Sequence, residues 1–145
     1  MKRMVPVLFV LLMSACSTPK VQSPNVLFIF VDDLRPQLGC YGHTQMKTPN
    51  IDQLAEGGLL FNASYCNVPV CGASRASIMS GMRGTPSRFV HWYIKMEEDA
   101  PEAISLPGHF KANGYKCLSL GKTFHHSEDC EEDWSELPWR PDQYS

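Results

Sequence analysis

The feature that most constrains the fold is an unbroken apolar run that stops abruptly at two acids. Residues 25–31 read NVLFIFV, and Asp32 and Asp33 follow at once. A run of β-favouring residues without apolar–polar alternation is typical of a strand buried on both faces, as in a parallel sheet covered by helices. Ligands bind beyond the carboxyl ends of such strands. The sequence therefore predicts an α/β fold with two acids at the edge of its sheet.

Helix and strand signals alternate after this run, which also favours the α/β class. Thr48 at the cap position, Pro49 after it and a Gly-Gly stop frame the first helix. A later helix is stopped by Gly114. Residues 84–104 are expected to form a loop around a short helix. The expected helices cover residues 48–58, 74–79 and 105–113, and the expected strands cover residues 25–31, 59–65 and 115–120.

The composition fits one globular domain or part of a larger one. The chain has 145 residues, a net charge of -2 and 43% hydrophobic residues. Because there is no basic excess, we expect no nucleic-acid partner.

The N-terminal residues predict export. Lys2 and Arg3 precede an apolar run that is shorter than the ~20 residues needed to span a bilayer. Residues 13–16 read MSAC and resemble a bacterial lipobox, whose cysteine is lipidated. We therefore expect residues 1–16 to be an export signal ending in a lipobox, and residues 17–24 to be a short linker. The expected location is periplasmic or outer-membrane-anchored, with membrane contact only through a lipid on Cys16; an ordinary cleaved signal is the alternative.

The number of cysteines is odd once Cys16 is set aside, so they cannot all pair in disulfides within the chain. Without Cys16, five cysteines remain, and in an oxidising compartment an odd cysteine suggests one reserved for chemistry. If that residue is Cys71, the others form two disulfides in any of three connectivities, or stay as four buried thiols. These other cysteines are Cys40, Cys66, Cys117 and Cys130.

Candidate functional residues converge on one sheet edge. Residues 71–75 read CGASR where a loop turns into a helix, so Cys71 and Arg75 share a helix face. Lys122 and His125 follow the last expected strand, at the same edge as the two acids. Adjacent carboxylates suit Ca²⁺, although an isolated Asp-Asp pair usually only caps a loop. A thiolate is a poor calcium ligand, so Cys71 is either a nucleophile activated by His125 or a residue converted to an oxygen nucleophile.

These residues resemble a known family. The CGASR motif resembles the signature of type I sulfatases, in which the cysteine is oxidised to formylglycine. The likeness extends over about residues 25–126, and the DDLRP and GKTFH motifs are most similar to the iduronate-2-sulfatase branch. The other matching segments are residues 25–36, 48–55, 77–83 and 114–125.

The resemblance implies an alkaline-phosphatase-like sheet flanked by helices, and a role for each site residue. Cys71, as formylglycine hydrate, would attack sulfur, and its oxygen would join Asp32 and Asp33 on Ca²⁺. Arg75 would hold the hydrate, Lys122 would bind sulfate oxygens, and His125 would assist proton transfer. The implied partners are a sulfated, glycosaminoglycan-like carbohydrate as substrate and a formylglycine-generating maturation enzyme.

Two departures from the family pattern qualify this hypothesis. Ala73 stands where proline is commonest, a variant seen in bacterial sulfatases. Members of the family are also several times longer, so we expect residues 25–145 to be the N-terminal part of a catalytic domain, inactive alone. The acids after His126 are expected to form a solvated loop. The alternatives are a phosphoester or phosphonoester hydrolase of the same superfamily, and a non-catalytic truncated lipoprotein.

Overall fold

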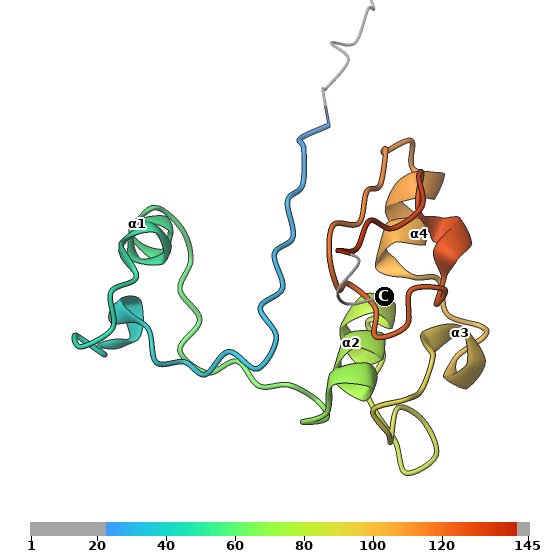
Figure 1. Ribbon diagram of the computed structural model, residues 1–145, viewed down its shortest axis with the longest axis horizontal. Coiled ribbons are helices and arrows are strands. Elements are labelled where there is room, and N and C mark those ends of the chain that lie inside the picture. Colours follow the sequence, from blue (N-terminus) through green and yellow to red (C-terminus); the bar gives the residue numbers. More distant parts are fainter. Residues whose placement is uncertain (1–22, 142–145) are drawn as a thin grey trace, which may run out of the picture.

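The computed structural model describes residues 23–141, which form short helices joined by long loops (Figure 1). The expected export signal, the lipid site at Cys16 and most of the linker lie outside these residues. None of the helices described is long and apolar enough to cross a membrane. The helices are α1 (Pro49–Gly57), α2 (Cys71–Ser80), α3 (Met96–Asp99) and α4 (Leu106–Ala112), with 3-10 turns η1 (Gly39–Tyr41) and η2 (Glu131–Asp133).

The expected helices are present, and their ends follow from local sequence. The Ser105 hydroxyl accepts a hydrogen bond from Gly108 N at 3.0 Å and caps α4. Gly114 has a φ of 85°, the left-handed conformation that ends a helix easily at glycine. Thr48 does not cap α1 as expected: its hydroxyl donates to Asp52 Oδ1 and accepts from Gly39 N instead. Thr48 therefore ties α1 to η1.

The helices gather in two places. Figure 1 shows α1 and η1 together on one side, and α2, α3 and α4 on the other. The α1 helix contacts η1 among the described elements, and none of its residues is buried. The hydrophobic core lies around α2 instead, and its fully buried members include Ala73, Ala76, Phe89, Met96 and Ala100. The helix that begins at Cys71 is therefore the best-anchored element described.

The predicted strands are not observed in residues 23–141. Residues 25–31 run extended but unpaired, and Leu27 is 84% exposed instead of buried on both faces. The other two segments also lack strand pairing, apart from an isolated parallel bridge between Leu120 and Trp139. Residues 26–30 and 115–118 line the same groove of about 410 Å³. Parallel strands are stable only beside paired neighbours, and the described residues supply none.

The five described cysteines are free thiols, so the structure pairs none of the four that were expected to form disulfides. They are not four buried thiols either, because only Cys130 is buried and Cys66 is exposed. Burial raises the pKa of the Cys130 thiol, and the nearby carboxylates of Asp129 and Asp133 raise it further. The two thiols therefore differ in access, and Cys130 in addition resists ionisation.

We predict that iodoacetamide modifies Cys66 of the reduced native protein much faster than Cys130, since the thiolate is the reacting species. Peptide mass spectrometry over a time course measures both sites, and the same reaction in denaturant should make the two rates similar. Comparable native rates at the two cysteines would show that Cys130 is not buried.

Candidate active site

The α2 helix carries the first part of the site and is pressed against a neighbouring loop. A β-carbon added at Gly72 would lie 1.9 Å from the carbonyl oxygen of Trp92, which only a glycine avoids. The small residue after Cys71 therefore lets the loop containing Trp92 approach the start of the helix. Ala73 and Ala76 are fully buried behind it, so the face with Cys71 and Arg75 has little freedom to shift.

Arg75 joins three separated segments of the chain. Its guanidinium lies 3.1 Å from Asp32 Oδ1, donates to the carbonyl of Lys122 and donates at 2.9 Å to the carbonyl of Thr123. It also lies over the Phe30 ring, 5.8 Å from the centroid. Arg75 is only 5% exposed, so its charge needs these partners.

Lys122 completes a cationic pair around Asp32. Its Nζ lies 3.3 Å from Asp32 Oδ2, so each oxygen of this carboxylate faces one cation. Burial raises the pKa of Asp32, but the hydrogen bonds and charges of Arg75 and Lys122 outweigh it and hold the pKa below its usual value. Asp32 therefore stays ionised at neutral pH. Asp32, Arg75 and Lys122 thus meet, although residues 23–141 form no sheet edge at which the prediction placed Asp32, Asp33 and Lys122.

Cys71 and His125 form a second pair beside the first. Cys71 Sγ lies 3.3 Å from His125 Nδ1. The Trp92 ring meets the imidazole edge-on, with centroids 5.5 Å apart. Burial lowers the pKa of His125, and the charge of Lys122 lowers it further. A neutral imidazole beside the thiol can accept a proton from whichever nucleophile occupies position 71.

The expected calcium ligands are only partly assembled. Two adjacent carboxylates are the oxygen donors that Ca²⁺ prefers, and both acids are exposed. Asp33 has a left-handed φ of 54° and no side-chain hydrogen bond or ion pair with another described residue. Both oxygens of Asp32 face cations. The carboxylate oxygens are suitable donors for calcium. Within residues 23–141, however, Asp32 pairs with the two cations, and its oxygens do not form a ligand group with Asp33 and Cys71.

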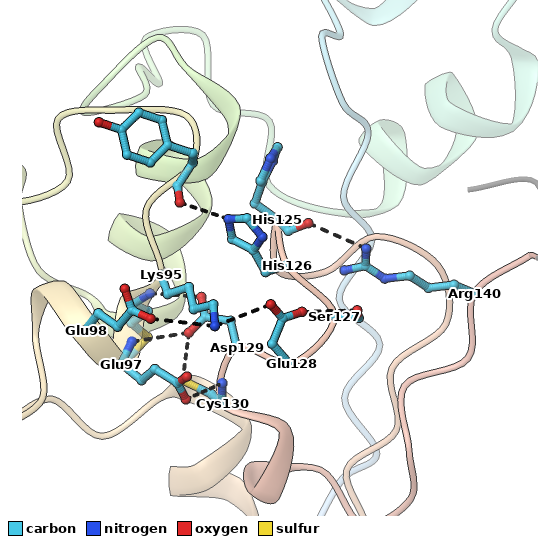
Figure 2. Close-up of polar contacts among 12 residues, drawn as sticks. Lys95, Glu97, Glu98, His125, His126, Ser127, Glu128, Asp129, Cys130 and Arg140 are labelled. Carbon is cyan, nitrogen blue, oxygen red and sulfur yellow. Dashed lines mark hydrogen bonds and ion pairs between the residues drawn. The ribbon is translucent and has the colours of Figure 1, made fainter. Parts of the chain in front are cut away.

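A clamp that sequence reasoning did not foresee holds the loop containing His125. Asp129 accepts from the backbone N–H of Met96 at 2.8 Å and of Glu97 at 3.2 Å, at the start of α3. His126 Nε2 lies 2.9 Å from the Tyr93 carbonyl. Figure 2 shows these contacts joining the loop after His125 to the segment around α3. Arg140 holds the other side by donating at 2.9 Å to the Phe124 carbonyl.

The acids after His126 were expected to be a solvated loop, and for Asp129 this was wrong. Asp129 is 2% exposed because its carboxylate serves the two α3 amides. Burial raises the pKa of Asp129, and its backbone hydrogen bonds oppose that rise. Glu128 is exposed as expected and pairs with Lys95 at 3.3 Å. No local signal identified Asp129, since its partners lie 33 and 32 residues away.

Comparison with known proteins defines the class. The profile of the Sulfatase family matches residues 24–132, and the chain belongs to this family. Its fold class is therefore the alkaline-phosphatase-like α/β class, although no sheet is formed within residues 23–141.

The chain is similar to several named sulfatases. Human iduronate 2-sulfatase is 42% identical over 123 residues, covering 81% of this chain and 22% of that protein. A sulfatase of Formosa agariphila is 40% identical over 114 residues, covering 74% of this chain and 22% of that protein. Human arylsulfatase A is 47% identical over 72 residues, covering 49% of this chain and 14% of that protein. The chain thus spans 22% of the length of the iduronate 2-sulfatase it resembles.

We predict that Asp129→Ala destabilises the protein by about 2–3 kcal/mol, because it removes the acceptor of the buried Met96 amide and of the half-buried Glu97 amide. Asp129→Asn keeps one acceptor oxygen and should lose less. Urea unfolding measures both, with Glu131→Ala as the control at an exposed acid two residues along. A loss for Asp129→Ala no larger than for Glu131→Ala would rule out the clamp.

Proposed function

We propose that this protein is part of a sulfuric ester hydrolase that removes sulfate from a sulfated carbohydrate. The observation that carries the proposal is the meeting of Arg75, Lys122 and Asp32 next to the Cys71–His125 pair. Two cations beside a nucleophile can stabilise the negative charge that develops when a sulfate ester is cleaved. Membership of the sulfatase family supports the same reaction.

In this proposal Cys71 acts as formylglycine rather than as a thiol. One hydroxyl of its hydrate attacks sulfur and displaces the sugar oxygen. The second hydroxyl then loses its proton, and the hydrate collapses to the aldehyde as sulfate leaves. His125 takes or returns the proton at Nδ1, which faces position 71. Arg75 Nε is buried without an acceptor among the described residues, so an oxygen of the hydrate or of sulfate would satisfy it.

Calcium is the proposed cofactor, held by Asp32, Asp33 and the oxygen of the converted Cys71. When bound, such an ion supplies positive charge that polarises the sulfate oxygens. Lys122, whose Nζ pairs with Asp32, would bind sulfate oxygens. Residues 25–145 contribute only this part of a cradle for Ca²⁺, which normally takes six to eight oxygen ligands, so we expect little turnover from them by themselves.

We also propose a substrate class, a maturation partner and a location for the protein. The relative named iduronate 2-sulfatase favours a glycosaminoglycan-like sulfate ester as substrate. A formylglycine-generating enzyme would be the maturation partner. The start of the sequence favours export to the periplasm or outer membrane, with a lipid on Cys16 as the membrane anchor.

A phosphoester or phosphonoester hydrolase is the second candidate, since the same cations suit a phosphoryl oxyanion. To separate the two, the protein is expressed from its complete reading frame with a formylglycine-generating enzyme and assayed with calcium on an aryl sulfate and an aryl phosphodiester. We expect faster turnover of the sulfate, and at least a hundredfold loss in Cys71→Ala, on the order expected when a nucleophile is removed. Faster turnover of the phosphodiester would contradict the proposal.

We further predict that Cys71 is converted to formylglycine in a host with the maturation machinery, despite Ala73 in place of proline. Peptide mass spectrometry of residues 71–75 should find the aldehyde at position 71. The neighbouring Cys66 should remain a thiol and serves as the internal control. An intact thiol at Cys71 in such a host would favour the ordinary cysteine nucleophile.

A further inference from the structure

Three consecutive rings form an exposed aromatic surface beside the Cys71–His125 pair. Trp92 is 58% exposed and Tyr93 is 56% exposed. The His91 and Tyr93 rings stack with centroids 5.2 Å apart and planes at 5°, and Trp92 meets Tyr93 edge-on at 5.6 Å. We call residues 91–93 the aromatic platform. Trp92 and Tyr93 therefore leave large ring faces open to a ligand beside the reacting residues.

The platform is fixed to the site by contacts of two kinds. The Trp92 carbonyl fills the space where Gly72 has no side chain. The Trp92 ring packs edge-on against His125, whose Nδ1 faces Cys71 Sγ at 3.3 Å. The Tyr93 carbonyl is held by His126. An exposed ring is thus set next to the reacting atom by the backbone on both sides, which is how a pre-organised binding surface is built.

The charges around the platform restrict its occupant. Lys122 and Arg75 place two cations around Asp32, so the anionic end of a ligand belongs there. The Trp92 and Tyr93 rings of the platform carry no formal charge at neutral pH. A ligand that spans both parts therefore has a sulfate at one end and an uncharged face with C–H groups at the other. A pyranose ring bearing a sulfate ester has this form.

We propose that the aromatic platform binds the sugar ring of the substrate, with Trp92 stacking on it, and so selects sulfated carbohydrates over sulfate alone. The proposal rests on the proposed sulfatase function and adds the residues that recognise the sugar. Removing the Trp92 ring is expected to weaken binding of the sugar about tenfold, which corresponds to about 1.4 kcal/mol.

The test measures binding without turnover, in the Cys71→Ala protein. The ligands are an iduronate 2-sulfate glycoside and inorganic sulfate, each titrated by calorimetry, while saturation-transfer NMR reports which sugar protons lie against aromatic side chains. Trp92→Ala should weaken the glycoside about tenfold, abolish saturation of its ring protons and leave inorganic sulfate unchanged. Trp92→Phe should restore most of the affinity. Phe61→Ala, at an exposed ring near α1, is the control and should change neither ligand.

Several results would overturn the proposal. Equal loss of both ligands in Trp92→Ala would mean that Trp92 only supports the structure around Gly72. Unchanged glycoside binding, or glycoside binding no tighter than that of inorganic sulfate, would mean that the platform does not recognise sugar. In each of these cases the proposed sulfatase function would be tested separately, by measuring sulfate-ester turnover of the protein with intact Cys71. Absence of binding by either ligand would overturn the platform and count against the proposed function as well.

Discussion

The buried guanidinium of Arg75 is the interaction on which the rest of the site depends. A charge that is 5% exposed must be paired and hydrogen-bonded, because leaving it alone would cost several kcal/mol. Arg75 meets this need with Asp32 from one segment and the carbonyls of Lys122 and Thr123 from another. Those partners lie directly after two of the three segments predicted to be strands, residues 25–31 and 115–120. One side chain of α2 therefore fixes where both segments end, and with them the acid and the lysine.

The position of His125 follows from the same anchoring. Thr123 is held by Arg75, and the Phe124 carbonyl by Arg140, which leaves the imidazole facing Cys71. The clamp from Asp129 to α3 then fixes the other side of the loop (Figure 2). The loop before α3 carries Trp92, whose carbonyl packs against Gly72 and whose ring meets His125, so this loop supports both the nucleophile and the imidazole. Rigid support of this kind is what precise placement of reacting groups requires.

Local signals predicted much of this and failed where partners are distant. The shared face of Cys71 and Arg75 follows from residues four apart, although α2 begins at Cys71 and not at residue 74 as predicted. The buried strand at residues 25–31 did not appear, because pairing depends on neighbours that the pattern cannot supply. Asp129 was misjudged as solvated for the same reason. Three consecutive aromatic residues at 91–93 were a signal that could have marked the platform.

A double-mutant cycle between Arg75 and Asp32 tests the central claim most directly. Unfolding free energies are measured for the wild type, Asp32→Asn, Arg75→Gln and the double variant. If Arg75 holds Asp32 as described, the double variant should be less destabilised than the sum of the single variants by about 1 kcal/mol. Additivity within about 0.3 kcal/mol would show that the two residues do not interact, and would contradict the account of how the site is assembled.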